Sequence, residues 1–125
     1  MIHLDTHVVV WLYAGLVDKL SETAWQLLES EELRISPMVQ LELQYLHEIG
    51  RLRDPATTIV ADLGRRIGLG LAGTPLDAVV AEALALSWTR DPFDRLIVGS
   101  ALADGVRLVT ADRHLRERVP TAVWD

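Results

Sequence analysis

Four carboxylates occur where a folded chain could bring them together, and they are Asp5, Glu42, Asp94 and Asp112. Hard divalent cations such as Mg²⁺ or Mn²⁺ prefer oxygen ligands, usually one or two carboxylates together with water and substrate phosphate. Carboxylates that hold such an ion can activate a water molecule and stabilise the charge that develops on a phosphate. The residue types therefore favour metal-dependent hydrolysis of a phosphate ester. Acids alone also permit a phosphatase that acts on small molecules.

Asp5 and Asp112 each lie just beyond a short apolar segment, residues 1–4 and 106–109 respectively. If both segments are parallel strands, both carboxylates reach the carboxyl edge of the sheet, where ligands bind in open α/β folds. Each also suits the N-cap of a following helix, because a short acidic side chain accepts hydrogen bonds from free N–H groups there. Considered singly, each of the two is explained by capping.

Glu42 lies on a segment that Pro37 opens as a helix and Gly50 closes. A helical wheel places Glu42 in the middle of an apolar face that consists of Met38, Val39, Tyr45, Leu46 and Ile49. An ionised carboxylate on such a face is costly unless something compensates it. Two explanations remain open, a buried ion pair with Arg95 and a metal site at the rim of the core, and we favour the metal site.

Asp94 precedes apolar residues at spacings of three, four and seven, so it is predicted to face inward on its helix. Asp91 fits the N-cap of that helix and Pro92 its first position, so Asp94 can also help to cap the same end. This geometry places Asp94 at a helix N-terminus beside the predicted sheet edge. One acid would then serve both purposes.

The elements that must position these acids alternate along the chain. Strands are predicted at residues 1–4, 33–35, 106–109 and 121–124, with a weak strand inside the glycine-rich loop 68–73. Helices are predicted at residues 7–14, from Ser21, and at 37–49, 54–67, 74–86, 91–104 and after Asp112. This alternation predicts one α/β domain over residues 1–125, with a central, mainly parallel sheet and helices on both faces.

Composition narrows the function further. The chain has 125 residues, half of them hydrophobic, which suits one well-packed domain. Because there are no cysteines, disulfides, zinc–thiolate sites and thiol nucleophiles are excluded. A net charge of −6 argues against a protein that coats nucleic acid, although bound cations would offset the charge of a carboxylate site locally. No leader or membrane-spanning run is visible, so we expect a soluble cytoplasmic protein.

Four segments resemble PIN-domain proteins, and most of all the VapC-type toxins of prokaryotic toxin–antitoxin pairs. They are residues 4–8 (LDTHV), 36–42 (SPMVQLE), 91–97 (DPFDRLI) and 108–112 (LVTAD). The resemblance covers essentially the whole chain in the right order, and residues 91–97 are its most specific part. It implies a three-layer α/β/α PIN-like domain and an Mg²⁺- or Mn²⁺-dependent endoribonuclease that cuts RNA with an activated water.

The resemblance also assigns roles to individual residues. Asp5 and Asp94 would be direct metal ligands, whereas Glu42 and Asp112 would act directly or through water. Thr110 would support the site by hydrogen bonding, and Asp91 is a fifth acid that fits a cap better. The family's members usually form homodimers and act as growth-inhibiting toxins. A small cognate antitoxin inhibits them by occupying the active-site groove.

Other chemistries fit the sequence less well. A receiver-like phosphoacceptor needs a lysine near a late strand, and the only lysine is Lys19. A serine hydrolase would need a Gly-x-Ser-x-Gly elbow, which is absent. The alternative that stays open is a PIN-like module without catalysis that binds RNA or protein.

The histidines and tryptophans are given structural interpretations. The four histidines form no pair at metal-ligand spacing and are interpreted as structural or solvent-facing: His3, His7, His47 and His114. The four tryptophans are interpreted as core or interface anchors rather than base-stacking platforms: Trp11, Trp25, Trp88 and Trp124.

Overall fold

A five-stranded parallel sheet forms the centre of the computed structural model, which describes residues 1–125. The order is β3-β2-β1-β4-β5, and every neighbouring pair is parallel. The strands are β1 (Ile2–Leu4), β2 (Leu33–Ile35), β3 (Gly70–Leu71), β4 (Leu108–Val109) and β5 (Ala122–Val123). The predicted fold class is confirmed, including the weak strand in the glycine-rich loop.

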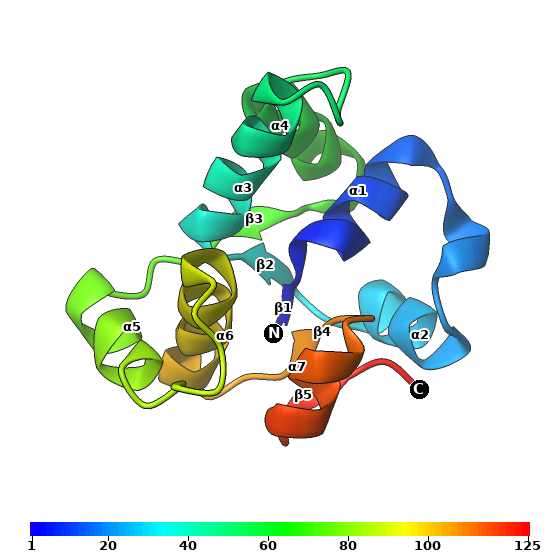
Figure 1. Cartoon of the computed structure of the whole chain (residues 1–125). Coiled ribbons are helices and arrows are strands. Elements are labelled where there is room, and N and C mark those ends of the chain that lie inside the picture. Colours follow the sequence, from blue (N-terminus) through cyan, green and yellow to red (C-terminus); the bar gives the residue numbers. More distant parts are fainter.

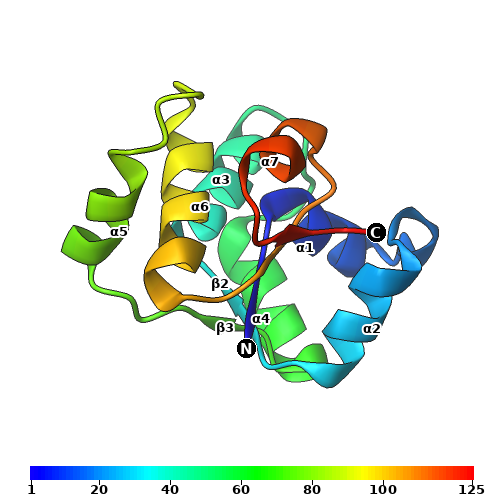
Figure 2. The same ribbon diagram turned by 90° about the horizontal axis from the view of Figure 1, so that it is seen from below.

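Helices connect the strands and lie on both sides of them. They are α1 (Thr6–Ala14), α2 (Glu22–Ser30), α3 (Pro37–Glu48), α4 (Ala56–Ile67), α5 (Leu76–Ala83), α6 (Pro92–Asp104) and α7 (Arg113–Arg118), with a 3₁₀ turn η1 (Val17–Lys19) that was not predicted. Both views show α5 and α6 on one side of the strands and α1 and α2 on the other (Figures 1 and 2). None of the helices has the length and apolar character needed to cross a bilayer.

Two predicted boundaries are wrong. The strand predicted at residues 106–109 begins only at Leu108, and α5 ends at Ala83 and not at Leu86. The guanidinium of Arg95 donates two hydrogen bonds to the Ala83 carbonyl, at 3.2 and 3.1 Å, and a third to the carbonyl of Leu84. The Ala83 carbonyl also accepts the backbone N–H of Leu86 at 3.1 Å, in the turn that follows the helix. A side chain from α6 thus donates to the carbonyls at the end of α5.

The chain order reverses at β1, which pairs with β2 on one side and β4 on the other. Ile2 and Leu4 of β1 and both residues of β4 are fully buried, as strands covered on both faces should be. The backbone N–H of Asp5 extends the ladder by donating to the Val109 carbonyl at 3.0 Å. The ends of β1 and β4 thus meet at the switch point, where α/β sheets bind ligands.

A buried polar network that includes His3 joins β1 to the far end of α6. The Nε2 of His3 lies 2.7 Å from Asp104 Oδ2, and Thr74 donates its hydroxyl to the other carboxylate oxygen at 2.6 Å. His3 is 1% exposed, and its Nδ1 has no hydrogen-bond partner. Burial lowers the pKa of His3 from 6.5, and the Asp104 carboxylate opposes this while Arg34 adds to it.

Protonation of His3 is therefore expected to favour unfolding. The pKa of His3 is below 6.5 in the folded protein. The contribution of neutral His3 to stability is therefore complete above pH 6.5, and it is lost as the pH falls through the lower pKa of the folded state. We expect wild type to lose stability relative to His3→Gln between about pH 7.5 and about pH 5.5 in urea unfolding. The difference between the two proteins is the readout, because acids elsewhere contribute equally to both. A constant difference would refute the role of His3.

Candidate active site

Asp5 begins the site at the end of β1. It is the N-cap of α1, and its Oδ1 accepts a hydrogen bond from the backbone N–H of Thr6 at 2.8 Å. Its Oδ2 accepts the hydroxyl of Thr110 at 2.6 Å, across the junction of β1 and β4. The side chain is only 6% exposed, and this burial raises its pKa, whereas the two hydrogen bonds oppose the rise. Asp5 is thus both the expected helix cap and a fixed carboxylate at the sheet edge.

Thr110 links Asp5 to Asp112. Its fully buried hydroxyl donates to Asp5 and accepts the backbone N–H of Asp112 at 3.1 Å. Asp112 is exposed and caps α7, since its Oδ1 accepts the N–H of Leu115 at 3.1 Å. The negative charge of Asp112 also contributes to the raised pKa of Asp5, after burial and the hydrogen bonds. The two strand-end acids are therefore near neighbours.

Glu42 reaches the same edge from α3, but its predicted place on the helix is wrong. The buried face of α3 runs through Val39 and Leu43, both 0% exposed, whereas Tyr45 and Ile49 are 48% and 49% exposed. Glu42 lies half-buried at the border between these faces, not in the middle of the apolar face. The helical wheel failed because α3 carries apolar side chains outside the core as well as inside it.

The hydroxyl of Thr6 donates to Glu42 Oε1, which ties α3 to the start of α1. Burial raises the pKa of Glu42, the Thr6 hydrogen bond lowers it, and the charges of Asp5 and Asp91 raise it further. The alternative of an ion pair with Arg95 is not found, because that guanidinium is engaged by the carbonyls at the end of α5. Glu42 therefore faces other acids and forms no ion pair with an arginine or lysine.

Asp94 approaches from the first turn of α6. Asp91 caps this helix, accepting the N–H groups of Phe93 and Asp94 at 2.9 and 3.5 Å, in agreement with the cap predicted for it. Asp94 is half-buried, and its pKa is raised to about 7. Burial is the largest cause, followed by repulsion from four acids: Asp91, Asp5, Asp112 and Glu42. Four elements therefore direct the predicted acids to one place.

The side chains of the site are of the chemical types that bind a divalent cation, but they lie too far apart to form a complete set of ligands. All the donors are carboxylate and hydroxyl oxygens, which Mg²⁺ and Mn²⁺ prefer. However, no three acidic or histidine side chains come close enough together to count as a ready-made metal site. Mutual repulsion among carboxylates opposes closer approach, and a cation would remove that repulsion.

Two neighbours of the acids were not identified from the sequence. The buried side chain of Thr6 holds Glu42, a contact that the sequence did not indicate. His7 was interpreted as structural or solvent-facing, and it is exposed, but its imidazole also affects the acids. Burial is the main cause of the raised pKa at Asp5 and Glu42, and His7 opposes the rise at both. The signal available in the sequence was that both residues directly follow Asp5.

The comparisons with known proteins agree with one another. The PIN domain family model matches residues 2–119. The chain is 35% identical to Ribonuclease VapC22 of Mycobacterium tuberculosis, over 97% of this chain and 96% of that protein. Among solved structures, VapBC2 from Rickettsia felis bound to a promoter DNA fragment matches with a TM-score of 0.69 and 21% identity, covering both chains completely.

A toxin–antitoxin complex from Klebsiella pneumoniae matches with a TM-score of 0.67 and 16% identity, over 98% of this chain and 96% of that one. At such low identities the two structures establish the fold alone. The family model and the mycobacterial relative go further, because each spans nearly the whole chain. This chain belongs to the PIN-domain family.

Proposed function

We propose that this protein is an Mg²⁺- or Mn²⁺-dependent endoribonuclease and acts in the cytoplasm as the growth-inhibiting toxin of a toxin–antitoxin pair. The observation that carries the proposal is the convergence of Asp5, Glu42, Asp94 and Asp112, whose mutual repulsion helps to raise the pKa of Asp94 to about 7. Strongly shifted pKa values cluster at functional sites, where acids are brought together for chemistry. The ribonuclease name of the mycobacterial relative supports RNA as the substrate.

Within this proposal the acids have unequal roles. Asp5 and Asp94 hold the metal directly, and Glu42 and Asp112 hold it directly or through water. When bound, the cation would polarise a phosphate oxygen and lower the pKa of a water molecule so that it can attack the phosphorus. Asp91 remains the cap of α6 rather than a ligand.

The threonines position these ligands. Thr110 donates to Asp5 Oδ2, and the N–H of Thr6 donates to Oδ1, so both oxygens of this carboxylate are fixed before anything binds. The hydroxyl of Thr6 fixes Glu42 in the same way. Such outer partners orient ligands and strengthen binding, because the ligands need not be ordered at the moment of reaction.

RNA cleavage by the purified chain tests the proposal. We expect cleavage with Mg²⁺ or Mn²⁺, none in EDTA, and a large loss in Asp5→Asn. Asp18→Asn is the matched control, because Asp18 is exposed on η1 and takes no part in the site. Cleavage in EDTA, or undiminished cleavage by Asp5→Asn, would refute the metal mechanism. Tight RNA binding without cleavage would support the alternative, an inactive PIN-like module.

The partners we propose are a cognate antitoxin and a second copy of this chain. The similar solved structures are toxin–antitoxin complexes, which supports the antitoxin. For the homodimer, the support is an apolar face on α3, α5 and α6. Its exposed side chains include Leu76 at 70%, Leu84 at 72% and Leu41 at 55%. Monomeric proteins seldom leave so many large aliphatic side chains together in water.

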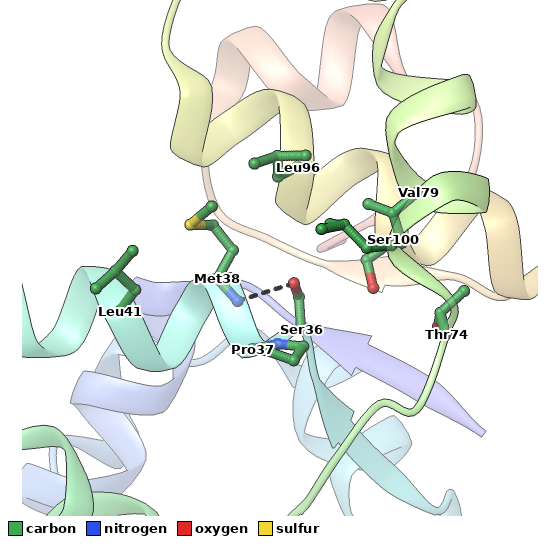
Figure 3. A pocket seen from close by; sticks show the side chains of 9 residues that line it. Ser36, Pro37, Met38, Leu41, Thr74, Val79, Leu96 and Ser100 are labelled. Carbon is green, nitrogen blue, oxygen red and sulfur yellow. Dashed lines mark hydrogen bonds between the residues drawn. The ribbon is translucent and has the colours of Figure 1, made fainter.

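Two hollows shape this face, and they share Leu96. The larger, of about 370 Å³, lies between the start of α3 and the pair α5–α6 and contains none of the four acids (Figure 3). The buried Ser100 hydroxyl points into it without a hydrogen-bond partner, between Ser36 and Thr74 (Figure 3). A side chain of a second copy with an apolar body and a polar tip would fill this hollow.

Charges introduced on this face are therefore expected to break the dimer. Leu76→Asp combined with Leu84→Asp should give a monomer in size-exclusion chromatography with light scattering, whereas wild type gives a dimer. Both side chains are at least 70% exposed, so the fold should survive. Leu16→Asp is the control, because Leu16 is 45% exposed but lies outside this face, between α1 and η1. A dimeric double variant would place the interface elsewhere.

A further inference from the structure

An aromatic row leads away from the acids along α1 and consists of His7, Trp11 and Trp124. The ring centroids of His7 and Trp11 are 6.1 Å apart, and those of Trp11 and Trp124 are 5.8 Å apart, both at tilted angles. The ammonium of Lys19, the only lysine of the chain, lies 5.9 Å from the Trp11 centroid. These spacings are typical of favourable aromatic and cation–π contacts.

The inner part of this row is not required for the hydrophobic core. Trp88 and Trp124 pack against the core cluster, as expected for structural anchors, but Trp11 does not. Trp11 is partly buried and pairs with both other rings of the row, and His7 is exposed. The structural interpretation of these two rings is therefore incomplete. An exposed ring braced by a second ring is a surface that can receive a flat ligand.

The row begins at the acids. His7 follows Thr6, whose hydroxyl holds Glu42, and its imidazole is close enough to act electrostatically on Asp5 and Glu42. At the other end, Trp124 lines an open hollow of about 730 Å³ together with Arg113, Arg116 and the acids Glu117 and Asp125. Arg116 donates to the Asp125 carboxylate at 2.9 Å, which leaves Arg113 as the cation of this hollow that an added phosphate could use. Rings thus lie next to the proposed cleavage site on a chain whose overall net charge is −6. The cations near the rings are Lys19, over Trp11, and Arg113, in the same hollow as Trp124.

We propose that His7, braced by Trp11, stacks on an unpaired nucleobase of the RNA beside the phosphate that is cut. This inference rests on the proposed function and adds a substrate-positioning residue to it. Single-stranded RNA combines a flat face on each base with a charged backbone, and proteins bind it with aromatic rings and nearby cations. The rings and cations of this row match that combination, whereas a purely apolar peptide would not use the cations.

Binding of oligoadenylate of about ten nucleotides tests the stack. The measurement is fluorescence anisotropy in an Asp94→Asn background, which prevents cleavage. We expect His7→Ala to weaken binding roughly 5- to 150-fold, the range of one base–aromatic stack. His7→Phe should restore binding to within about threefold, because it keeps a flat ring. Trp25→Ala is the control, since Trp25 is 39% exposed on α2 and belongs to no aromatic pair of the row.

A single abasic nucleotide moved along the oligomer provides a second readout that a merely structural role of His7 would not change. At one position, the abasic nucleotide should weaken binding by the wild-type protein as much as His7→Ala weakens binding of the intact oligomer. The two losses of affinity should not add when both changes are made. Equal binding by His7→Ala, or an abasic profile that this substitution leaves unaltered, overturns the inference even if wild type cuts RNA. If His7→Ala weakens binding of the antitoxin but not of RNA, the aromatic row binds a protein, and the base-stacking inference is overturned as well. A wild-type chain that neither binds nor cuts RNA overturns the proposed function as well.

Discussion

Asp94→Asn is expected to reduce metal-dependent RNA cleavage by more than about a hundredfold, beyond the 10- to 100-fold typical when an outer partner of a metal ligand is lost. The reason is that asparagine keeps the size of Asp94 but removes its negative charge, which lies among the charges of the other acids and would bind the cation. Cleavage rates of wild type and variant at saturating Mg²⁺ measure the effect. Wild-type rates in the variant would show that Asp94 is not a ligand.

The same substitution is expected to stabilise the protein when no metal is present. Asp94 has its pKa raised from 3.8 to about 7, so ionisation costs stability as the pH rises between these values and the full cost is present above pH 7. Because solvent reaches this half-buried carboxylate, we discount the cost to about 1–2 kcal/mol. In urea unfolding with EDTA, Asp94→Asn should exceed wild type in stability at about pH 8 and gain less at about pH 5.

Opposite changes in activity and stability separate function from folding. When a residue that serves stability is replaced, the protein loses both activity and stability. When an acid of the site that lies among like charges is neutralised, the protein loses activity but gains stability. Addition of Mn²⁺ should reverse the order, since wild type is stabilised by about 2.7 kcal/mol at a concentration of one hundred times Kd. Asp94→Asn should gain much less. A destabilised variant in EDTA would show that Asp94 acts mainly as part of the α6 N-terminus.

The sequence predicted the strand-end acids well because their positions depend on local signals. Asp5 and Asp112 follow short apolar strands, and Asp91 precedes a proline, so both the caps and the sheet edge can be deduced from neighbouring residues. In a parallel sheet these local facts also fix the side of the sheet on which the acids lie. The fold class follows from the same alternation of elements.

Relations between distant residues could not be predicted in this way. The hydrogen bond from Thr6 to Glu42 joins residues 36 positions apart, and it depends on how α3 packs beside α1. The helical wheel assumed that all apolar residues of α3 face the core, yet Tyr45 is 48% exposed and lies 5.9 Å from Phe93, centroid to centroid. When apolar residues of one helix lie partly in the core and partly on an exposed surface, their spacing in the sequence cannot show where the core ends.

Thr110→Val is expected to reduce cleavage about 10- to 100-fold while leaving all four acids in place. Valine has nearly the shape of threonine, but it removes the donor to Asp5 Oδ2 and the acceptor of the Asp112 N–H. The freed carboxylate of Asp5 is 6% exposed, so water cannot replace the lost donor, and its pKa, already raised by burial, should rise further. Asp5 would then hold a cation less well at neutral pH.

Thr110→Ser is the control that decides how this loss is interpreted, because it keeps the hydroxyl and removes only a methyl group. If Thr110 acts through Asp5, the serine variant should retain most of the activity, and raising the Mg²⁺ concentration or the pH should partly restore Thr110→Val. A packing role predicts the reverse order, since valine fills the fully buried site better than serine. Equal activity in the valine variant and wild type would mean that the Thr6 N–H alone holds Asp5, and that the contact across the strand junction serves the fold rather than the reaction.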